Sequence, residues 1–385
     1  MEELILGNLT QRKIGYGIVQ PGENVSSGVH IIKVNNIITG LTQLSNLDST
    51  TTEIEKKYSR TRLRGNELII SIVGTIGKTA IVPKEFAGCN IVRAIALIDI
   101  QDRILTLWVK YYIDSPKGQE YIKENLNTTV QPTLNIKSLS NMPIPFYSTT
   151  YTQKVVDILS TIDNKILLNK QINENLEQQA QALFKSWFVD FEPFKDGKFV
   201  DSELGMIPEE LNIRYIGDIP HTIECGRRPK GGATDKGVPS IGAENIKGLG
   251  IYDYSKTKYI PKEFALTTNR GKINGYELLI YKDGGKPGYF IPNYTIFGDG
   301  FPFDEMFINE HVFKLDLLNK EYNIFAYFYM QTPFIMNQLN SIGGKAAIPG
   351  INTKDVESLP IFSYENNKIL SSTYKCNFLG ADNKQ

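Results

Sequence analysis

The chain has 385 residues with 42 basic and 42 acidic side chains, so the molecule as a whole does not attract a polyanion. The hydrophobic share of 41% and the charged share of 22% are ordinary for a soluble globular protein that is long enough for two or three domains. Any nucleic-acid site must therefore be a local basic patch.

The few cysteines and histidines are scattered along the chain, which argues against a disulfide framework, a zinc ribbon or another metal site. They are Cys89, Cys225, Cys376, His30, His221 and His311. Residues 1–8 lack a signal-peptide pattern, and no stretch approaches the apolar length of a membrane span. We expect a cytoplasmic protein in a reducing compartment, with no membrane partner.

The first 146 residues alternate between strand and helix patterns. Strands are predicted at Val29–Val34, Glu67–Val73 and Ile91–Ile100, and a helix at Leu105–Asn125. Glycine and proline residues separate these elements, which predicts a compact mixed α/β domain at residues 1–146.

A long helix follows within residues 147–193, because apolar and amide positions recur there at alternating spacings of four and three. The positions are Val155, Leu159, Ile162, Ile166, Asn169, Asn173, Leu176, Ala180, Leu183 and Trp187. This is a heptad seam of the coiled-coil type, and at 1.5 Å per residue it would span roughly 48 Å, or about 14 base pairs of duplex. A buried helix of an ordinary globular domain is the less favoured interpretation.

The part of the chain after this helix repeats the part before it. A polar connection is expected at residues 194–214, and a second domain at residues 215–363. Gly-Asn-Glu-Leu-Ile-Ile from Gly65 aligns with Gly-Tyr-Glu-Leu-Leu-Ile from Gly275, at an offset of 275 − 65 = 210. Pro-Thr-Leu-Asn-Ile-Lys from Pro132 aligns with Pro-Gly-Ile-Asn-Thr-Lys from Pro349, at 349 − 132 = 217. The predicted architecture is thus α+β or α/β, with two copies of one domain joined by a long helix.

A glycine-rich hairpin follows the same strand in both halves. Residues 74–79 read Gly-Thr-Ile-Gly-Lys-Thr, but position 72 is Ile where a phosphate loop needs Gly, so we reject a nucleotide site. Residues 282–288 read Lys-Asp-Gly-Gly-Lys-Pro-Gly at the equivalent place. A cationic tip of this kind suits phosphate or base-edge contact, although an ordinary tight turn explains either tip alone.

Other basic residues could contribute to a DNA surface or could simply be solvated. Three arginines alternate at positions 60, 62 and 64, so an extended backbone would project them from one face. They could lie along a DNA backbone, or they could be solvated charges on an edge strand that prevent aggregation. The candidate DNA-binding residues are Arg60, Arg62, Arg64, Thr75, Lys78, Arg93, Arg227, Arg228, Lys230, Lys286 and Lys345.

Catalytic constellations were not found in the sequence. There is no GxSxG elbow, no Cys/His pairing, no dinucleotide fingerprint and no Asn-Pro-Pro-aromatic segment of the kind shared by adenine methyltransferases. We therefore interpret the chain as a binding protein with no catalytic residues and no bound cofactor.

Two central segments resemble the conserved central region of type I restriction-modification specificity subunits. Residues 178–193 read Gln-Gln-Ala-Gln-Ala-Leu-Phe-Lys-Ser-Trp-Phe-Val-Asp-Phe-Glu-Pro, and residues 202–209 read Ser-Glu-Leu-Gly-Met-Ile-Pro-Glu. Residues 14–22 and 74–78 resemble the first target-recognition domain of that family, and residues 225–232 with 238–241 resemble the opening of the second.

The resemblance implies a non-catalytic reader of double-stranded DNA. Each target-recognition domain would read one half of a bipartite site, and the helix would act as a spacer. Methyltransferase subunits would dock alongside and methylate adenine with S-adenosylmethionine, and restriction or motor subunits would add cleavage driven by ATP with Mg.

The chain departs from the family pattern at two places. Leu211 stands where the family usually has Trp. After Ser363 the family would supply a second long helix, whereas residues 364–385 carry no sustained heptad. We expect a truncated second spacer helix there, so that the unpaired seam could bind another copy of the chain or depend on the methyltransferase subunits. The alternative is that the tail forms a short, irregular second helix.

A coiled-coil scaffold with duplicated protein- or carbohydrate-binding domains is the alternative function. The zero net charge favours the scaffold slightly, and the two matching cationic tips favour DNA. The sequence does not specify which bases would be read, because readout depends on the placement of side chains.

Overall fold

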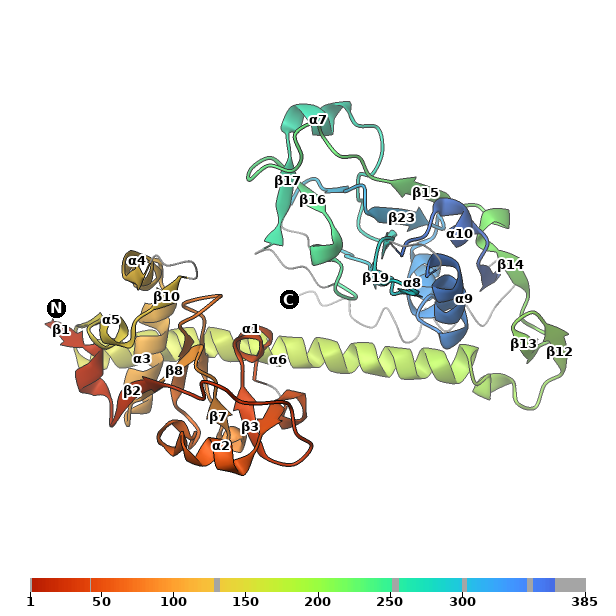
Figure 1. Ribbon diagram of the computed structural model, residues 1–385. Coiled ribbons are helices and arrows are strands. Elements are labelled where there is room, and N and C mark those ends of the chain that lie inside the picture. Colours follow the sequence, from red (N-terminus) through yellow and green to blue (C-terminus); the bar gives the residue numbers. More distant parts are fainter. Residues whose placement is uncertain are drawn as a thin grey trace. The chain divides into compact units, whose positions relative to one another are not determined.

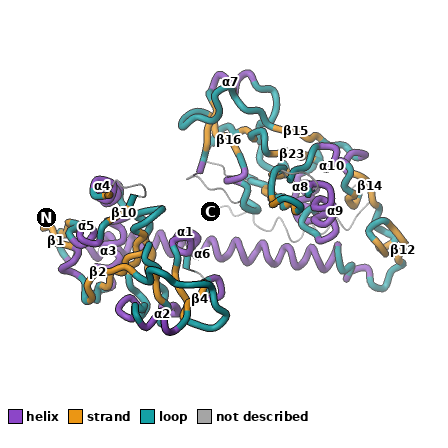
Figure 2. The backbone as a smooth tube through the Cα atoms, viewed as in Figure 1, coloured by secondary structure: helices purple, strands orange, loops and turns teal. Residues whose placement is uncertain are grey.

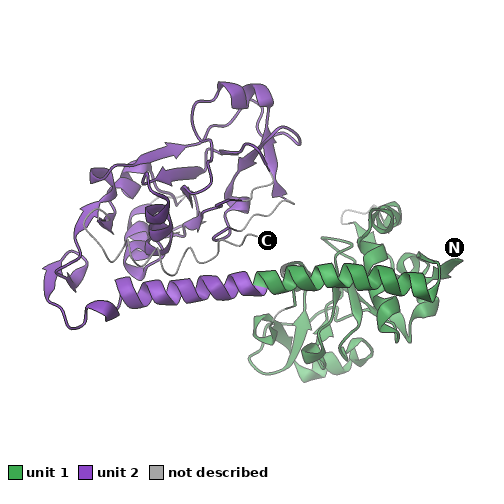
Figure 3. Ribbon diagram, turned by 180° about the vertical axis from the view of Figure 1, so that it is seen from behind, with its two compact units in different colours: residues 1–170 green, residues 171–385 purple. Residues whose placement is uncertain are grey.

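The computed structural model describes residues 2–41, 43–127, 132–250, 256–299, 303–344 and 349–363. The chain forms two compact units, unit 1 with residues 1–170 and unit 2 with residues 171–385, which Figure 3 colours separately. Both are mixed α/β bodies, and the helix α6 (Thr149–Phe188) contributes residues to each (Figure 1). The predicted mixed architecture with a long helix is confirmed.

Unit 1 is built on a four-stranded antiparallel sheet in the order β2-β8-β5-β6 and a three-stranded sheet in the order β4-β3-β7. The strands are β1 (Glu2–Ile5), β2 (Arg12–Tyr16), β3 (Val29–Ile32), β4 (Asp48–Thr50), β5 (Leu68–Ser71), β6 (Thr79–Ile81), β7 (Asn90–Ile91), β8 (Ile95–Asp99), β9 (Leu126–Asn127), β10 (Thr133–Leu134) and β11 (Pro143–Phe146). The helices are η1 (Leu6–Leu9), α1 (Val34–Thr39), η2 (Leu44–Asn46), α2 (Thr52–Lys56), η3 (Ser59–Thr61), η4 (Lys84–Phe86), α3 (Arg103–Asp114), α4 (Pro116–Glu124) and α5 (Ile136–Ser140).

The central strand β5 is buried on both of its faces. Leu68 and Ile70 pack in the cluster that contains Trp108 of α3, whereas Ile69 packs in a second cluster with Ile32. Successive side chains of a strand point to opposite faces, so a continuous apolar run is what a doubly covered strand requires.

The predicted helix Leu105–Asn125 is wrong in one respect, because two helices meet at Ser115. The hydroxyl of Ser115 accepts a hydrogen bond from the Gly118 amide, and Pro116 occupies the first turn of α4. Proline lacks an N–H and pushes the preceding residue into extended backbone, so Ser115 ends α3 and caps α4. The predicted strand Ile91–Ile100 is similarly divided into β7 and β8 by residues 92–94, and the two strands pair in different sheets.

Unit 2 repeats this plan with the sheets β15-β23-β18-β21 and β17-β16-β22. Its strands are β12 (Phe199–Ser202), β13 (Gly205–Pro208), β14 (Ile213–Tyr215), β15 (Thr222–Cys225), β16 (Val238–Ile241), β17 (Lys258–Ile260), β18 (Leu278–Tyr281), β19 (Gly285–Lys286), β20 (Tyr289–Phe290), β21 (Asn293–Thr295), β22 (Phe307–Ile308), β23 (Val312–Asp316) and β24 (Pro360–Phe362). Its helices are η5 (Glu192–Phe194), η6 (Ile216–Asp218), η7 (Ala243–Asn245), α7 (Lys262–Thr267), α8 (Lys320–Tyr329), α9 (Pro333–Gly343) and α10 (Thr353–Glu357). The expected polar connection therefore contains the β12–β13 hairpin, and Leu211 beside it is buried.

The two units share their strand registers, which confirms the internal repeat. Leu68 pairs with Ile98 in unit 1, and Leu278 pairs with Leu315 in unit 2. The parallel strands agree as well, since Ile31 is opposite Asn90 and Ser240 is opposite Phe307. The difference in residue number between equivalent positions of the two units is near 210 up to β5 and 217 from β7 onward. It increases because unit 2 has a longer connection between β18 and β22 than unit 1 has between β5 and β7.

The helix α6 has 40 residues. Figure 2 shows it as one unbroken purple helix. Val156 is buried in the core of unit 1, and Phe184 and Phe188 are buried in the core of unit 2. Between these anchors the predicted seam lies open, with Ile162 50%, Ile166 49% and Leu176 53% exposed. The expected second spacer helix at residues 364–385 lies outside the described residues.

Close backbone contacts require glycine at equivalent places in the two units, Gly17 and Gly226. A Cβ on Gly17 would lie 1.8 Å from the carbonyl oxygen of Ile91, and a Cβ on Gly226 would lie 2.0 Å from that of Ile308. Such distances are impossible without moving the backbone, so these glycines fix how the chain leaves β2 and β15 beside β7 and β22.

We predict that Gly17→Ala lowers the free energy of unfolding of unit 1 by about 2–3 kcal/mol, because the new methyl group forces the backbone apart. Amide hydrogen exchange of β2 and β8 measures this loss. Gly15→Ala is the matched control, since its nearest neighbouring atom would be 3.8 Å away. Equal exchange in the two variants would contradict the steric argument.

Candidate nucleic-acid interface

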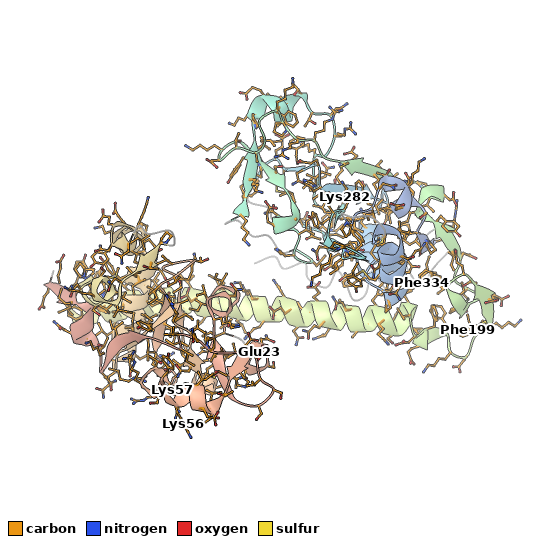
Figure 4. All side chains as sticks on the ribbon, viewed as in Figure 1. Glu23, Lys56, Lys57, Phe199, Lys282 and Phe334 are labelled. Carbon is orange, nitrogen blue, oxygen red and sulfur yellow. The ribbon has the colours of Figure 1, made fainter. Side chains whose placement is uncertain are left out.

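Three loops meet at one end of the four-stranded sheet in each unit, and we call this the three-loop end. In unit 1 it comprises residues 17–22, 72–78 and 92–94, and in unit 2 residues 226–231, 282–292 and 309–311. Hydrogen bonds join the loops in the same way, since the amide of Ile72 donates to the carbonyl of Ala94 (2.8 Å) and that of Lys282 donates to the carbonyl of His311 (3.0 Å). Lys282, labelled in Figure 4, marks this end of unit 2.

The hairpin loop of unit 1 is held from inside by Ser71. Its hydroxyl donates to the Thr75 carbonyl (2.5 Å) and accepts from the Lys78 amide (2.9 Å). Gly74 and Gly77 both have positive φ, so the tip of the turn lies at residues 74–77. Lys78 was expected at the tip but stands directly before β6, and its side chain is exposed together with that of Thr75.

Arg93 adds a third exposed residue beside this loop. It lies in the turn between β7 and β8, and its amide donates to the carbonyl of Ile18 (2.8 Å). The structure therefore brings Thr75, Lys78 and Arg93 to one sheet end. Within the described residues, Lys78 and Arg93 take part in no ion pair, so both charges are available to a ligand.

The predicted strip of Arg60, Arg62 and Arg64 is wrong as an extended segment. Residues 59–61 form the 3₁₀ helix η3, and the backbone there is held by Arg12, which donates to the carbonyls of Arg62 (2.8 Å) and Arg60 (3.3 Å). All three arginines are exposed, but they lie at the sheet end opposite the three-loop end, next to the start of β5.

Arg62 forms an ion pair within unit 1, so its charge is not free to bind a ligand. Its guanidinium donates to both carboxylate oxygens of Glu55, which is fully buried, and Asn90 donates to one of the same oxygens (3.1 Å). The hydrogen bond from Arg62 holds the pKa of Glu55 below its ordinary value in spite of burial.

A buried carboxylate at the start of the central strand was missed by sequence reasoning. Glu67 accepts from the Arg64 amide (2.6 Å) and from Arg12 (2.7 Å), and Glu277 accepts from the amides of Asn274 (3.0 Å) and Gly275 (2.8 Å). The shared Gly-x-Glu pattern in the two halves was the available signal. Both carboxylates satisfy backbone donors at the far end from the loops, so their role is structural.

Unit 2 also exposes cations at its three-loop end. Arg227 and Lys230 follow β15, and Lys286 stands in the small hairpin formed by β19 and β20. Arg228 lies 3.4 Å from Glu310, so it is paired. Lys345 lies outside the described residues.

Acidic residues at the same end form a network that the sequence analysis did not single out. Nδ1 of His311 lies 2.7 Å from Asp283, its Nε2 lies 3.5 Å from Glu310, and Lys282 lies 3.1 Å from Asp283. Residues 282–283 and 310–311 are far apart in sequence, and only the hydrogen-bonded meeting of the loops brings the two pairs together.

Over the described ranges no cluster of His, Cys, Asp and Glu could hold a metal ion. Among the helices that the structure describes, none is long and apolar enough to cross a membrane.

Comparison with known proteins places these units in context. Residues 20–178 match the family model described as the type I restriction modification DNA specificity domain. The chain is 32% identical over 181 residues to the type I restriction enzyme EcoBI specificity subunit of Escherichia coli, covering 45% of this chain and 37% of that protein. It is 36% identical over 121 residues to the MjaIX specificity subunit of Methanocaldococcus jannaschii, covering 31% and 28%. The chain thus spans about a third of these relatives' lengths.

Two further comparisons extend over nearly the whole chain. The putative type I restriction enzyme MjaX specificity subunit of Methanocaldococcus jannaschii is 24% identical over 397 residues, covering 97% of this chain and 84% of that protein. The crystal structure of the type I restriction-modification S subunit from M. genitalium superposes with a TM-score of 0.50 at 12% identity, covering 98% and 88%. At that identity the likeness concerns the fold.

We predict that Arg62→Gln destabilises unit 1 at neutral pH, because the buried Glu55 carboxylate loses its strongest partner. A carboxyl whose pKa is lowered by folding contributes stability above its unfolded pKa, roughly 4.3, and that contribution disappears as the pH falls through the folded value. The difference in thermal midpoint between native chain and variant should therefore be full at pH 7 and shrink below about pH 4.

Arg64→Gln is the control, since the Arg64 side chain is exposed and makes no ion pair among the described residues. A midpoint difference for Arg62→Gln that stays constant from pH 7 to pH 3 would show that the ion pair is not responsible.

Proposed function

We propose that this chain is a type I restriction-modification specificity subunit, the non-catalytic, sequence-reading DNA subunit of such a complex, as the matched family model and the named relatives support. The named relatives support this reading over a coiled-coil scaffold with duplicated protein- or carbohydrate-binding domains.

The observation that carries the proposal is the repetition of the three-loop end. Both units present exposed cations there on loops set by the same strand registers, Lys78 and Arg93 in unit 1 and Arg227, Lys230 and Lys286 in unit 2. Lysine and arginine on loops at a strand end can contact phosphates and base edges, while the buried sheet keeps the loops in place. Each unit would read one half of a bipartite site in double-stranded DNA.

Catalysis in this proposal belongs to other chains. Methyltransferase subunits would use S-adenosylmethionine to methylate adenine, and restriction or motor subunits would use ATP and Mg to cleave unmodified DNA. This chain would bind none of these cofactors itself and would act in the cytoplasm.

The open part of α6 is the surface that we assign to a partner in the complex. Val156 near one end of α6 and Phe188 near the other are buried. Between them several apolar residues are each between 45% and 62% exposed, among them Ile158, Ile162, Ile166, Ile172 and Leu176. An apolar stripe of this length is costly in water and favours a second helix packed against it. We propose that methyltransferase subunits cover it in the assembled complex, and that in their absence a second copy of this chain can do so.

We predict that Lys78→Glu lowers the affinity of the assembled methyltransferase for its DNA roughly tenfold and reduces the slope of log affinity against log salt by about one, because a phosphate contact becomes a repulsion. Lys286→Glu tests unit 2 in the same way. Fluorescence anisotropy at several salt concentrations measures both quantities.

Lys84→Glu is the matched control for the hairpin. It makes the same charge change on an exposed residue that follows β6 at the opposite end from Lys78. If Lys78→Glu and Lys84→Glu bound DNA with the same affinity and salt slope, the hairpin loop would not be part of the interface.

We predict that Ile166→Glu weakens association with the methyltransferase subunits or with a second copy at least tenfold while α6 stays helical, because a charge enters the apolar stripe. Sedimentation velocity and circular dichroism measure the two effects. Gln171→Glu places the same charge on the opposite side of the helix and should leave assembly unchanged. Equal assembly by both variants would exclude the stripe as an interface.

A further inference from the structure

The two three-loop ends carry opposite charges at one matching position. The turn between β7 and β8 has three residues, 92–94, and the turn between β22 and β23 also has three, 309–311. Because the flanking strands share their register, Arg93 of unit 1 corresponds to Glu310 of unit 2. A cation and a carboxylate thus stand at the same place on the same scaffold.

The positions next to this pair also differ between the units, because unit 2 has ionisable residues where unit 1 has apolar ones. Counting along the equal registers places Ala94 opposite His311 and Val73 opposite Asp283, so apolar residues in unit 1 correspond to ionisable ones in unit 2. Residues 17–22 and 226–231 also have equal length and begin at equivalent close-contact glycines, which places Val19 opposite Arg228. Unit 2 therefore contains a network of ionisable side chains at the place where unit 1 has an exposed arginine among apolar side chains.

The network fixes Glu310 without burying it. One of its carboxylate oxygens lies 3.4 Å from Nη1 of Arg228 and 3.5 Å from Nε2 of His311, and its side chain is 30% exposed. His311 is in turn held by Asp283 at 2.7 Å. A carboxylate held from two sides keeps lone pairs for a further donor, because an ionised carboxylate offers about four acceptor positions.

A carboxylate is unfavourable on a surface that meets only phosphates, but it has a defined use against base edges. Glutamate and aspartate accept from the exocyclic amino group of cytosine in the major groove, whereas arginine donates to the two acceptors of guanine. The same position on two copies of one scaffold can therefore select opposite hydrogen-bond patterns.

We propose that Glu310 is a base-reading residue of unit 2 that accepts from a base amino group, cytosine N4 in particular, and that Arg93 reads guanine at the equivalent place in unit 1. Arg228 and His311 act as positioning residues for Glu310. The inference rests on the proposed DNA-reading function and adds to it the class of base that each half-site presents at one position.

The test uses the full chain assembled with its methyltransferase subunits, and the methylated sequence motif is read by sequencing DNA modified in cells. Glu310→Gln should lose about tenfold or more of its preference for one base in one half of the motif, with the other half unchanged. Arg93→Gln should relax one position in the other half only. Because each variant leaves one half-site intact, the intact half reports that the complex has folded and assembled.

Glu305→Gln is the matched control. Glu305 is a carboxylate of similar exposure, 36%, that pairs with Lys272 before β22, on the side away from the turn. Its substitution should leave the motif unchanged.

A Glu310→Gln motif identical to that of the native chain, with the complex active, would overturn the inference and show that Glu310 only balances the charge of Arg228. The failure of the underlying function would look different, because the native complex itself would then methylate no bipartite motif.

Discussion

The constraint on which the fold depends is the complete burial of its central strands. Every residue of β5 is buried, and so are Leu278, Leu279 and Ile280 of β18. A strand covered on both faces has no side chain left for a ligand, and its backbone donors and acceptors must be paired along the whole length. Contact of these sheets with a ligand is thereby confined to the strand ends, where Ser71 at one end and Glu67 at the other satisfy the amides of the adjoining loops.

Structural features that depend on the local pattern of residues could be predicted from the sequence. The heptad spacing predicts one continuous α6, the apolar runs predict β5 and β18, and the paired motifs at Gly65 and Gly275 predict the duplication. The break between α3 and α4 was also readable, because Ser115 before Pro116 is a capping signal, but the apolar period across it favoured a single helix.

Features that arise from tertiary contact could not be read in this way. An alternating Arg-x-Arg-x-Arg pattern is compatible with a strand, yet residues 59–61 form a 3₁₀ helix and Glu55 and Arg12 hold Arg62 directly after it. The meeting of Arg228, Asp283 and Glu310 depends on contact among three loops, and the three residues are at least 27 positions apart in sequence. The roles of the candidate DNA residues, Thr75 and Lys78 among them, remain predictions.

Comparison of the two units distinguishes residues that the fold requires from residues that differ between the units. The glycines at positions 17 and 226 and the carboxylates at 67 and 277 keep their chemistry in both units because backbone approach and buried donors require it. The three-residue turns at 92–94 and 309–311 meet no such requirement, since their side chains are at least partly open to solvent. On the proposed function, a change of recognition can arise in one turn without disturbing the strands that carry it, so each unit could change its target while the other unit kept its own.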